Sequence, residues 1–221
     1  MISFRDSKKP GNGITTRALA SVVLVLALQL TGCMNKEERE IYYLDRAQEQ
    51  FDEGNLEKAR VEVKNVLQMN PAHGPARYLM FQINMAEGDS RGAVKHLNAA
   101  VDNDPDLIEA RVAKGEMMLA FGAQEQALEH ATAALKLDDG FADAHALMAR
   151  IHLRDDELDA ALKEANTALQ LDPANLKALK TLAKLYEEDQ PESVLKLVDK
   201  ALAVEPDDQQ LMLFRASLLN D

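Results

Sequence analysis

Three lysines near the C-terminal end of the chain share one face of a predicted helix. Lys177, Lys180 and Lys184 follow one another at intervals of three and four residues, so they form a basic stripe. The chain as a whole is acidic, with a formal net charge of −12, so a local excess of positive charge stands out in it. The stripe could bind an anionic glycan or a carboxylate, although most stripes of this kind are a solvated helix face.

Histidine and carboxylate side chains form no catalytic or metal-binding pattern. His145 and His152 lie two turns apart on one predicted helix, too far apart to share a metal ion without further ligands. Asp and Glu are abundant, but none sits in a recognisable catalytic pair. The acidity also argues against nucleic acid, which binds to basic surfaces. The sequence therefore predicts no enzyme, no metal, no cofactor and no nucleic-acid partner.

Cys33 is the single cysteine, and the residues before it suggest a covalent lipid. Basic residues precede an uncharged run of 13 residues from Ala18 to Leu30, which leads into the sequence Leu-Thr-Gly-Cys. A basic start, a short apolar run and small residues at its end form an export signal, and the run is too short for a permanent membrane span. Leu-Thr-Gly-Cys resembles the lipobox of bacterial lipoproteins, in which the signal is cut before the cysteine and the cysteine carries acyl chains such as palmitate.

The lipobox resemblance implies a signal peptide over residues 1–32 and an address at the outer membrane. Several acyl chains on Cys33 would give stable anchoring. In that family an Asp after the cysteine favours the inner membrane; here Met34 follows, so we expect an outer-membrane anchor on the periplasmic side. Residues 33–39 are expected to be the lipidated cysteine and a short polar tether. The alternative is an uncleaved anchor with a small buried cysteine.

The rest of the chain repeats with a fixed spacing. Gly54 and Pro71 reappear as Gly88 and Pro105, each 34 residues later. This period, with a helix–turn–helix in each unit, resembles tetratricopeptide repeats. The lack of Trp and the scarcity of aromatic residues fit packed helices better than a β-sandwich. The resemblance implies an all-α, right-handed superhelical solenoid of antiparallel helix pairs, whose concave groove is lined mainly by the first helix of each pair.

The repeat frame divides the array into five units and an incomplete sixth. The units span approximately 40–73, 74–107, 108–141, 142–175, 176–208 and 209–221. The fourth has Asp155-Asp156 where others have glycine at the turn, so we expect a positive φ there without glycine. In the sixth, Leu211, Phe214, Ala216 and Leu218 are available for burial. We expect either a fragment of a longer array or a last helix covered by a partner.

The groove positions of the family are transferred to this chain by their place in each unit. The candidates are Leu44, Gln48, Phe51, Tyr78, Gln82, Met85, Val112, Glu116, Leu119, Ala146, Arg150, Leu153, Lys177, Lys180 and Lys184. This mixture of apolar and polar residues suits an extended or helical peptide, and the alternative is ordinary solvated or inter-repeat packing. The clamp with which chaperone-binding members hold an acidic tail needs Lys and Asn where this chain has Leu44 and Gln48. We therefore expect no such chaperone partner.

A lipobox followed by a repeat array indicates the class of function. The run from Val61 to Leu79 is similar to the first repeat of lipoproteins associated with exopolysaccharide production and PEP-CTERM protein sorting. We expect a non-catalytic, membrane-anchored interaction scaffold in the bacterial envelope, part of an export or assembly machine, that binds protein partners in its groove. The alternatives are a pilotin-like chaperone for an outer-membrane subunit and a direct polysaccharide-binding module that uses the lysine stripe.

Overall fold

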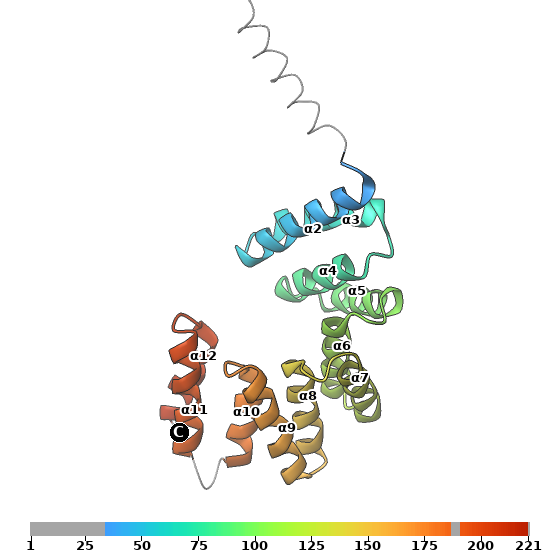
Figure 1. Ribbon diagram of the computed structural model, residues 1–221. Helices are drawn as coiled ribbons and strands as arrows, with labels where there is room; N and C mark the ends of the chain where they lie inside the picture. Colours follow the sequence, from blue (N-terminus) through green and yellow to red (C-terminus); the bar gives the residue numbers. More distant parts are fainter. Residues whose placement is uncertain (1–33, 187–190, 221) are drawn as a thin grey trace, which may run out of the picture.

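The computed structural model describes residues 34–186 and 191–220, and the regular structure in these residues is entirely α-helical. The helices are α2 (Lys36–Asp52), α3 (Leu56–Met69), α4 (Gly74–Ala86), α5 (Ser90–Asn103), α6 (Ile108–Ala120), α7 (Gln124–Leu137), α8 (Ala142–Arg154), α9 (Leu158–Leu171), α10 (Leu176–Tyr186), α11 (Pro191–Val204) and α12 (Gln209–Asn220). Short turns join consecutive helices into antiparallel pairs, beginning with α2 and α3 (Figure 1). The predicted all-α solenoid of helix pairs is confirmed.

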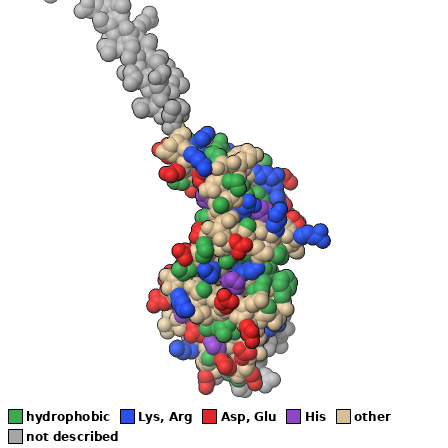
Figure 2. All heavy atoms as spheres, turned by 90° about the vertical axis from the view of Figure 1, so that its right-hand side faces the viewer, with side chains coloured by type: hydrophobic (Ala, Val, Ile, Leu, Met, Phe, Trp, Pro, Cys, Tyr) green, Lys and Arg blue, Asp and Glu red, His purple; other side chains and the backbone are tan. Residues whose placement is uncertain are grey.

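The pairs follow a curve (Figure 1). It runs from α2 and α3 at the top, past α6 and α7 on the right, to α11 and α12 at the lower left. The first helices of the pairs, α4, α6, α8 and α10, lie on the inner side of this curve. Figure 2 views the outer side near α5 and α7, where acidic and basic side chains are scattered among one another. The inner side is therefore the surface on which side chains from the first helices of several successive pairs can contact the same ligand.

Small residues at fixed positions let the helices of each pair approach closely. In α3 the buried residues Ala59, Val63 and Val66 recur at intervals of three and four, so one stripe faces the partner helix. The residues in phase with Ala59 in the next three units are Ala93, Ala127 and Ala161, all of them buried. In the fifth pair Val194 takes this place and is also buried, so a larger side chain is accommodated there.

The turn inside each of the first four pairs contains one residue in the left-handed conformation. Gly54, Gly88 and Gly122 have φ angles of 76°, 80° and 78°. In the fourth pair the same position is Asp156, with φ 62°, the only non-glycine residue with positive φ in the described part of the chain. The expected positive φ without glycine is confirmed, and it carries a steric cost that glycine avoids.

At this turn position, replacing glycine by a residue with a side chain should lower stability, and replacing Asp156 by glycine should raise it. Gly88→Ala is expected to lower the free energy of unfolding by about 1 kcal/mol, because a Cβ there meets open space and the cost is that of the backbone alone. Asp156→Gly is expected to raise it by about 0.5–1 kcal/mol. Urea denaturation followed by circular dichroism measures both. If both substitutions changed the free energy of unfolding in the same direction, the backbone strain of the left-handed conformation would not be what they share.

A repeated hydrogen bond ties the loop between pairs to the next first helix. Arg77 donates from Nη2 to the carbonyl oxygen of Pro71 at 2.8 Å. Arg111, one period later, donates to the carbonyl of Pro105. His145 replaces arginine in the next unit and contacts the carbonyl of Asp139 through Nε2 at 2.8 Å. The bond spans six residues each time, so it fixes the chain where one pair leads into the next.

The first helix begins earlier than expected. Asn35 accepts a hydrogen bond from the backbone N–H of Glu38, and the Glu38 carboxylate accepts one from the backbone N–H of Asn35, so a capping box starts α2 at Lys36. Residues 36–39, expected to be tether, are therefore helical. Cys33 and the expected signal peptide lie outside the described residues. Within residues 34–186 and 191–220 no helix combines the length and apolarity that crossing a membrane requires.

The last helix is only partly covered. Leu211 is fully buried against α11, and Phe214 and Leu218 pack partly against the same cluster. Ala216, which was expected to be available for burial, is exposed. Leu213 is 72% exposed, so α12 presents an apolar side chain to solvent.

Candidate functional site

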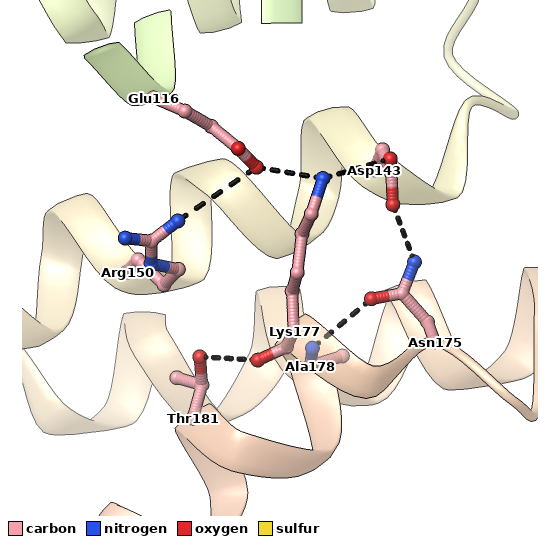
Figure 3. A network of polar contacts seen from close by, with 7 residues as sticks. All are labelled: Glu116, Asp143, Arg150, Asn175, Lys177, Ala178 and Thr181. Atoms are coloured by element: carbon pink, nitrogen blue, oxygen red, sulfur yellow. Dashed lines mark hydrogen bonds and ion pairs between the residues drawn. The ribbon is translucent and has the colours of Figure 1, made fainter. Parts of the chain in front are cut away.

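Lys177 lies at the centre of a charged network on the inner side of the curve (Figure 3). Its Nζ lies 2.8 Å from Oε1 of Glu116 on α6 and 3.0 Å from Oδ2 of Asp143 on α8. The contact with Asp143 is a directed hydrogen bond, while the contact with Glu116 is an ion pair outside hydrogen-bond geometry. One side chain of α10 thereby connects two preceding first helices.

The start of α10 holds this network in place. Asn175 precedes the helix, and its Oδ1 accepts from the backbone N–H of Ala178 at 3.0 Å, as a helix cap does. Its Nδ2 donates to Oδ1 of Asp143 at 2.7 Å (Figure 3). The cap therefore also orients the carboxylate that receives Lys177. Thr181, one turn on, donates from its hydroxyl to the carbonyl of Lys177 at 2.8 Å.

The network keeps Lys177 charged. Burial disfavours its ammonium form, but the carboxylates of Glu116 and Asp143 outweigh burial, so the net pKa of Lys177 is raised. Tyr78 on α4 lies within electrostatic reach of the same groups. Burial raises the pKa of Tyr78 to about 12, against the opposing effect of Lys177. At neutral pH Lys177 is therefore cationic and Tyr78 a neutral phenol.

A cavity of about 770 Å³ opens beside this network. Its lining comes from three first helices, α6, α8 and α10, and consists of Leu119, Ala120, Arg150, Leu153, Arg154, Lys177, Lys180, Thr181 and Lys184. Five of these residues are cationic and none is acidic. The inner side of an acidic protein thus contains a concave basic surface with an aliphatic floor.

The charges of this lining are unequally compensated. Glu116 and Asp143 neutralise Lys177, and Arg150 Nη1 lies 3.7 Å from Glu116 Oε1, a longer contact. Arg154 donates from Nη1 to the carbonyl of Leu119, which leaves its charge in place. Lys180 lies over the Phe214 ring, 6.0 Å from its centroid. Within the described residues no carboxylate pairs with Arg154, Lys180 or Lys184.

The structure brings together seven of the fifteen groove residues expected from the repeat frame. Those that line the cavity or reach its wall are Glu116, Leu119, Arg150, Leu153, Lys177, Lys180 and Lys184. Leu119 contributes mainly to the core, with 3% of its surface exposed. Val112 is 2% exposed and Ala146 fully buried, so both pack between helices and present no groove surface. Both belong to hydrophobic core clusters, so the prediction that they line the groove was wrong.

The remaining expected residues lie toward the N-terminal end and outside this cavity. Leu44 and Phe51 pack partly against the first core cluster. Gln48 donates along its own helix to Asp52 Oδ1 at 2.8 Å. Gln82 is half-buried and Met85 is 55% exposed on α4. Whether they contact a partner stays a prediction.

Arg154, Asp143, Asn175 and Thr181 were not identified from the sequence. The sequence did contain a signal for two of them. Asp143 and Lys177 are separated by 34 residues, one full period, so opposite charges occupy equivalent positions in adjacent units. Arg154 follows Arg150 by one helical turn and extends the basic surface along α8.

Two of the histidines contact carboxylates. His145 Nδ1 lies 2.6 Å from Glu164 Oε2, and His152 Nδ1 lies 2.7 Å from Glu157 Oε2. In the part of the chain that the structure describes, no three His, Cys, Asp or Glu side chains are grouped to hold a metal ion. Burial lowers the pKa of His96 and of His130, and Arg77 lowers that of His96 further.

These two lowered pKa values predict an acid-sensitive stability. Below the ordinary histidine pKa of 6.5, the unfolded chain binds protons at His96 and His130 before the folded chain does, so stability falls as the pH falls. Melting temperatures measured from about pH 7.5 down to about pH 5 should decrease more steeply for the wild type than for a variant with His96→Gln and His130→Gln. Parallel pH profiles would contradict this assignment.

Comparisons with known proteins agree with this architecture. The family model described as tetratricopeptide repeat matches residues 50–115. The crystal structure of TTC0263, a thermophilic TPR protein of Thermus thermophilus, is similar with a TM-score of 0.69 and 22% identity, over 82% of this chain and 100% of that chain. The array has the tetratricopeptide-repeat fold. Nothing among the curated proteins matches this chain.

Two further solved structures resemble the array. PilF of Pseudomonas aeruginosa is 15% identical with a TM-score of 0.64, over 83% of this chain and 90% of that chain. YrrB, described as a TPR protein with an unusual peptide-binding site, is 18% identical with a TM-score of 0.51, over 79% of this chain and 90% of that chain. Such identities show a common fold. Tetratricopeptide repeats generally mediate protein–protein interaction.

Proposed function

We propose that this protein is a lipid-anchored, non-catalytic scaffold of the bacterial envelope that holds a segment of a protein partner on its inner side, as part of an export or assembly machine. The observation that carries the proposal is the cavity between α6, α8 and α10. It is concave, its floor is aliphatic and its polar groups converge from three different helices, as is common in binding sites.

The fold supports a peptide segment as the occupant. Solenoids present an extended concave surface because each unit is slightly rotated against the last. YrrB, with the same fold, is described by its peptide-binding site, and another structure of similar fold is that of an APC/C hetero-tetramer containing Cut9 and Hcn1. Both descriptions concern protein recognition.

The anchor rests on the residues around Cys33. Helix α2 begins at Lys36, so only Met34 and Asn35 separate the expected lipidated cysteine from the array. With so short a link, the first pair would lie near the membrane surface and the cavity of α6, α8 and α10 several units away from it. This arrangement leaves the cavity accessible to a partner in the periplasm.

Site-specific photocrosslinking in cells tests the scaffold function. A photoreactive amino acid in place of Gln82 or Arg150 is expected to give a discrete adduct of higher mass that contains one partner protein. The matched control is the same amino acid at Lys64, an exposed position on the second helix of a pair. Adducts of the same pattern from both faces, or none from the groove, would refute a groove-bound partner.

Because the expected anchor is attached through the sulfur of Cys33, replacing that sulfur by oxygen should have a large effect on membrane attachment. Cys33→Ser is expected to abolish acylation, because the hydroxyl does not replace the thiol as lipid acceptor, and to move the protein out of the detergent phase. Metabolic labelling with a clickable palmitate analogue and phase partition measure the two effects. Retained label in the Cys33→Ser protein would show that the lipid is not on this residue.

A further inference from the structure

We propose that the cavity between α6, α8 and α10 binds an acidic segment of the partner, in which carboxylates alternate with apolar side chains. The inference rests on the proposed function and names the chemistry that the same site would recognise. Its basis is the distribution of charge around the cavity, the spacing of the four outer cations and the nature of the floor.

The charge of the cavity is opposite to that of the protein. The chain has a net charge of −12, yet the described residues that line the cavity include five cations and no carboxylate. Glu116 and Asp143 compensate Lys177, and Glu116 also lies 3.7 Å from Arg150, whereas no carboxylate of the described residues pairs with Arg154, Lys180 or Lys184. Like charges assembled without counter-charges repel one another, and an anionic ligand relieves this repulsion. The arrangement is therefore complementary to carboxylates.

The outer cations form two pairs with matching spacing. Arg150 and Arg154 are four residues apart on α8, and Lys180 and Lys184 are four residues apart on α10. Side chains at this separation lie about 5–6 Å apart along a helix. Carboxylates have nearly this spacing when they are one turn apart on a helix, or about 7 Å apart when they alternate along an extended strand. Either backbone brings two acidic side chains to two cations at once.

The floor of the cavity explains the apolar part of the segment. Leu119, Ala120 and Leu153 are the aliphatic residues of the lining, and Ala120 is exposed and Leu153 half-buried, whereas Leu119 is only 3% exposed. On a helical segment, an apolar side chain three residues from an acid lies beside it on the same face, so it can contact Leu153 while the acid meets a cation. The lining contains no aromatic residue. Arginine forks are suited to planar carboxylates, so the site fits an acidic peptide better than a polysaccharide.

Lys177 positions the other residues of the site, so a substitution of Lys177 is unsuited as a test of peptide binding. Its charge is compensated by two carboxylates, and replacing it would leave Asp143 without its ion-pair partner and Glu116 with only the longer contact to Arg150. A variant there would disturb the packing of three helices. Lys180 and Lys184 are exposed and carry no such network, so changing them alters the cavity and leaves the fold intact.

Fluorescence anisotropy with the full-length protein tests the proposal. The probe is a short fluorescein-labelled peptide in which glutamate alternates with leucine, and the comparison peptide has glutamine in place of glutamate. Binding of the glutamate peptide should weaken with added salt. The glutamine peptide should bind at least about 10-fold more weakly, and the double variant Lys180→Glu/Lys184→Glu should lose at least about 10-fold in affinity for the glutamate peptide.

The matched control is the double variant Lys64→Glu/Lys136→Glu. It makes the same change in net charge at exposed lysines of α3 and α7, outside the cavity, and should leave the affinity within about 2-fold of wild type. Equal losses in both double variants would show a general charge effect and overturn the proposal. So would equal binding of the two peptides, no binding of either, or polygalacturonate displacing the bound peptide more effectively than an unlabelled copy.

The outcome separates this inference from the scaffold function. A groove adduct in cells together with failure of the acidic peptide to bind would refute the acidic ligand and leave the scaffold intact. Peptide binding without any groove adduct would support the chemistry of the cavity and refute the envelope scaffold.

Discussion

Replacing Leu147 with alanine is expected to lower the free energy of unfolding by about 2–5 kcal/mol. Leu147 is fully buried on α8 and belongs to a cluster that includes Val112 of α6 and Ala131 of α7. Removing its side chain leaves a cavity at the junction of units three and four, which rigid helices on both sides fill only in part. Urea denaturation followed by circular dichroism gives the loss directly.

The control for this variant is a leucine of the same size at the surface. Leu213→Ala on α12 removes a side chain that is 72% exposed and should change stability by no more than about 0.5 kcal/mol. A loss at Leu147 as small as that at Leu213 would mean that the junction between units three and four does not depend on this side chain.

Substituting valine for Gly115 is expected to cost about 1–3 kcal/mol by overpacking the same junction. A Cβ at Gly115 would lie 2.6 Å from Cδ2 of Leu147 and 3.3 Å from the carbonyl oxygen of Ala127. In a helix interior, alanine normally stabilises relative to glycine by about 1 kcal/mol. Gly115→Ala should therefore gain less than that value, because the new methyl group displaces Leu147.

The two substitutions should partly compensate each other. Valine at Gly115 would occupy space that Leu147→Ala opens, so the double variant should lose less stability than the sum of the single losses. Strict additivity in this double-mutant cycle would show that the two side chains do not share the junction.

The helix pairs and their core were predictable from the sequence, because both follow from a period that is visible in residue types. Ala59 and Ala93 occupy one phase, and burial of small residues at that phase is what allows each pair to close. The left-handed residue at Asp156 was also predictable, since the turn geometry requires positive φ whichever residue occupies it. The start of α2 was missed although Asn35 and Glu38 have the spacing of a capping box.

The candidate site was predictable only in part, because it depends on how the pairs rotate against each other. The lysine stripe was visible at helical spacing, but nothing in the period indicates that Lys177 turns inward to Glu116, two units earlier, while Lys180 and Lys184 stay exposed. Val112 was assigned to the groove by its phase and lies in the core instead. The rotation between neighbouring pairs depends on the side chains that pack at their junction. Each junction is made by two units, so the pattern within a single repeat does not determine it.

The contact between Lys177 and Glu116 bears on how the array unfolds. In a solenoid whose units touch only their neighbours, stability is approximately the sum of the stabilities of the units and of the interfaces between adjacent units. Here the fifth unit is joined directly to the third as well as to the fourth. Opening α10 alone would expose carboxylates on two other units, so the third to fifth units are coupled more strongly than a nearest-neighbour chain allows. We therefore expect the opening of the fifth unit to loosen the third as well as the fourth.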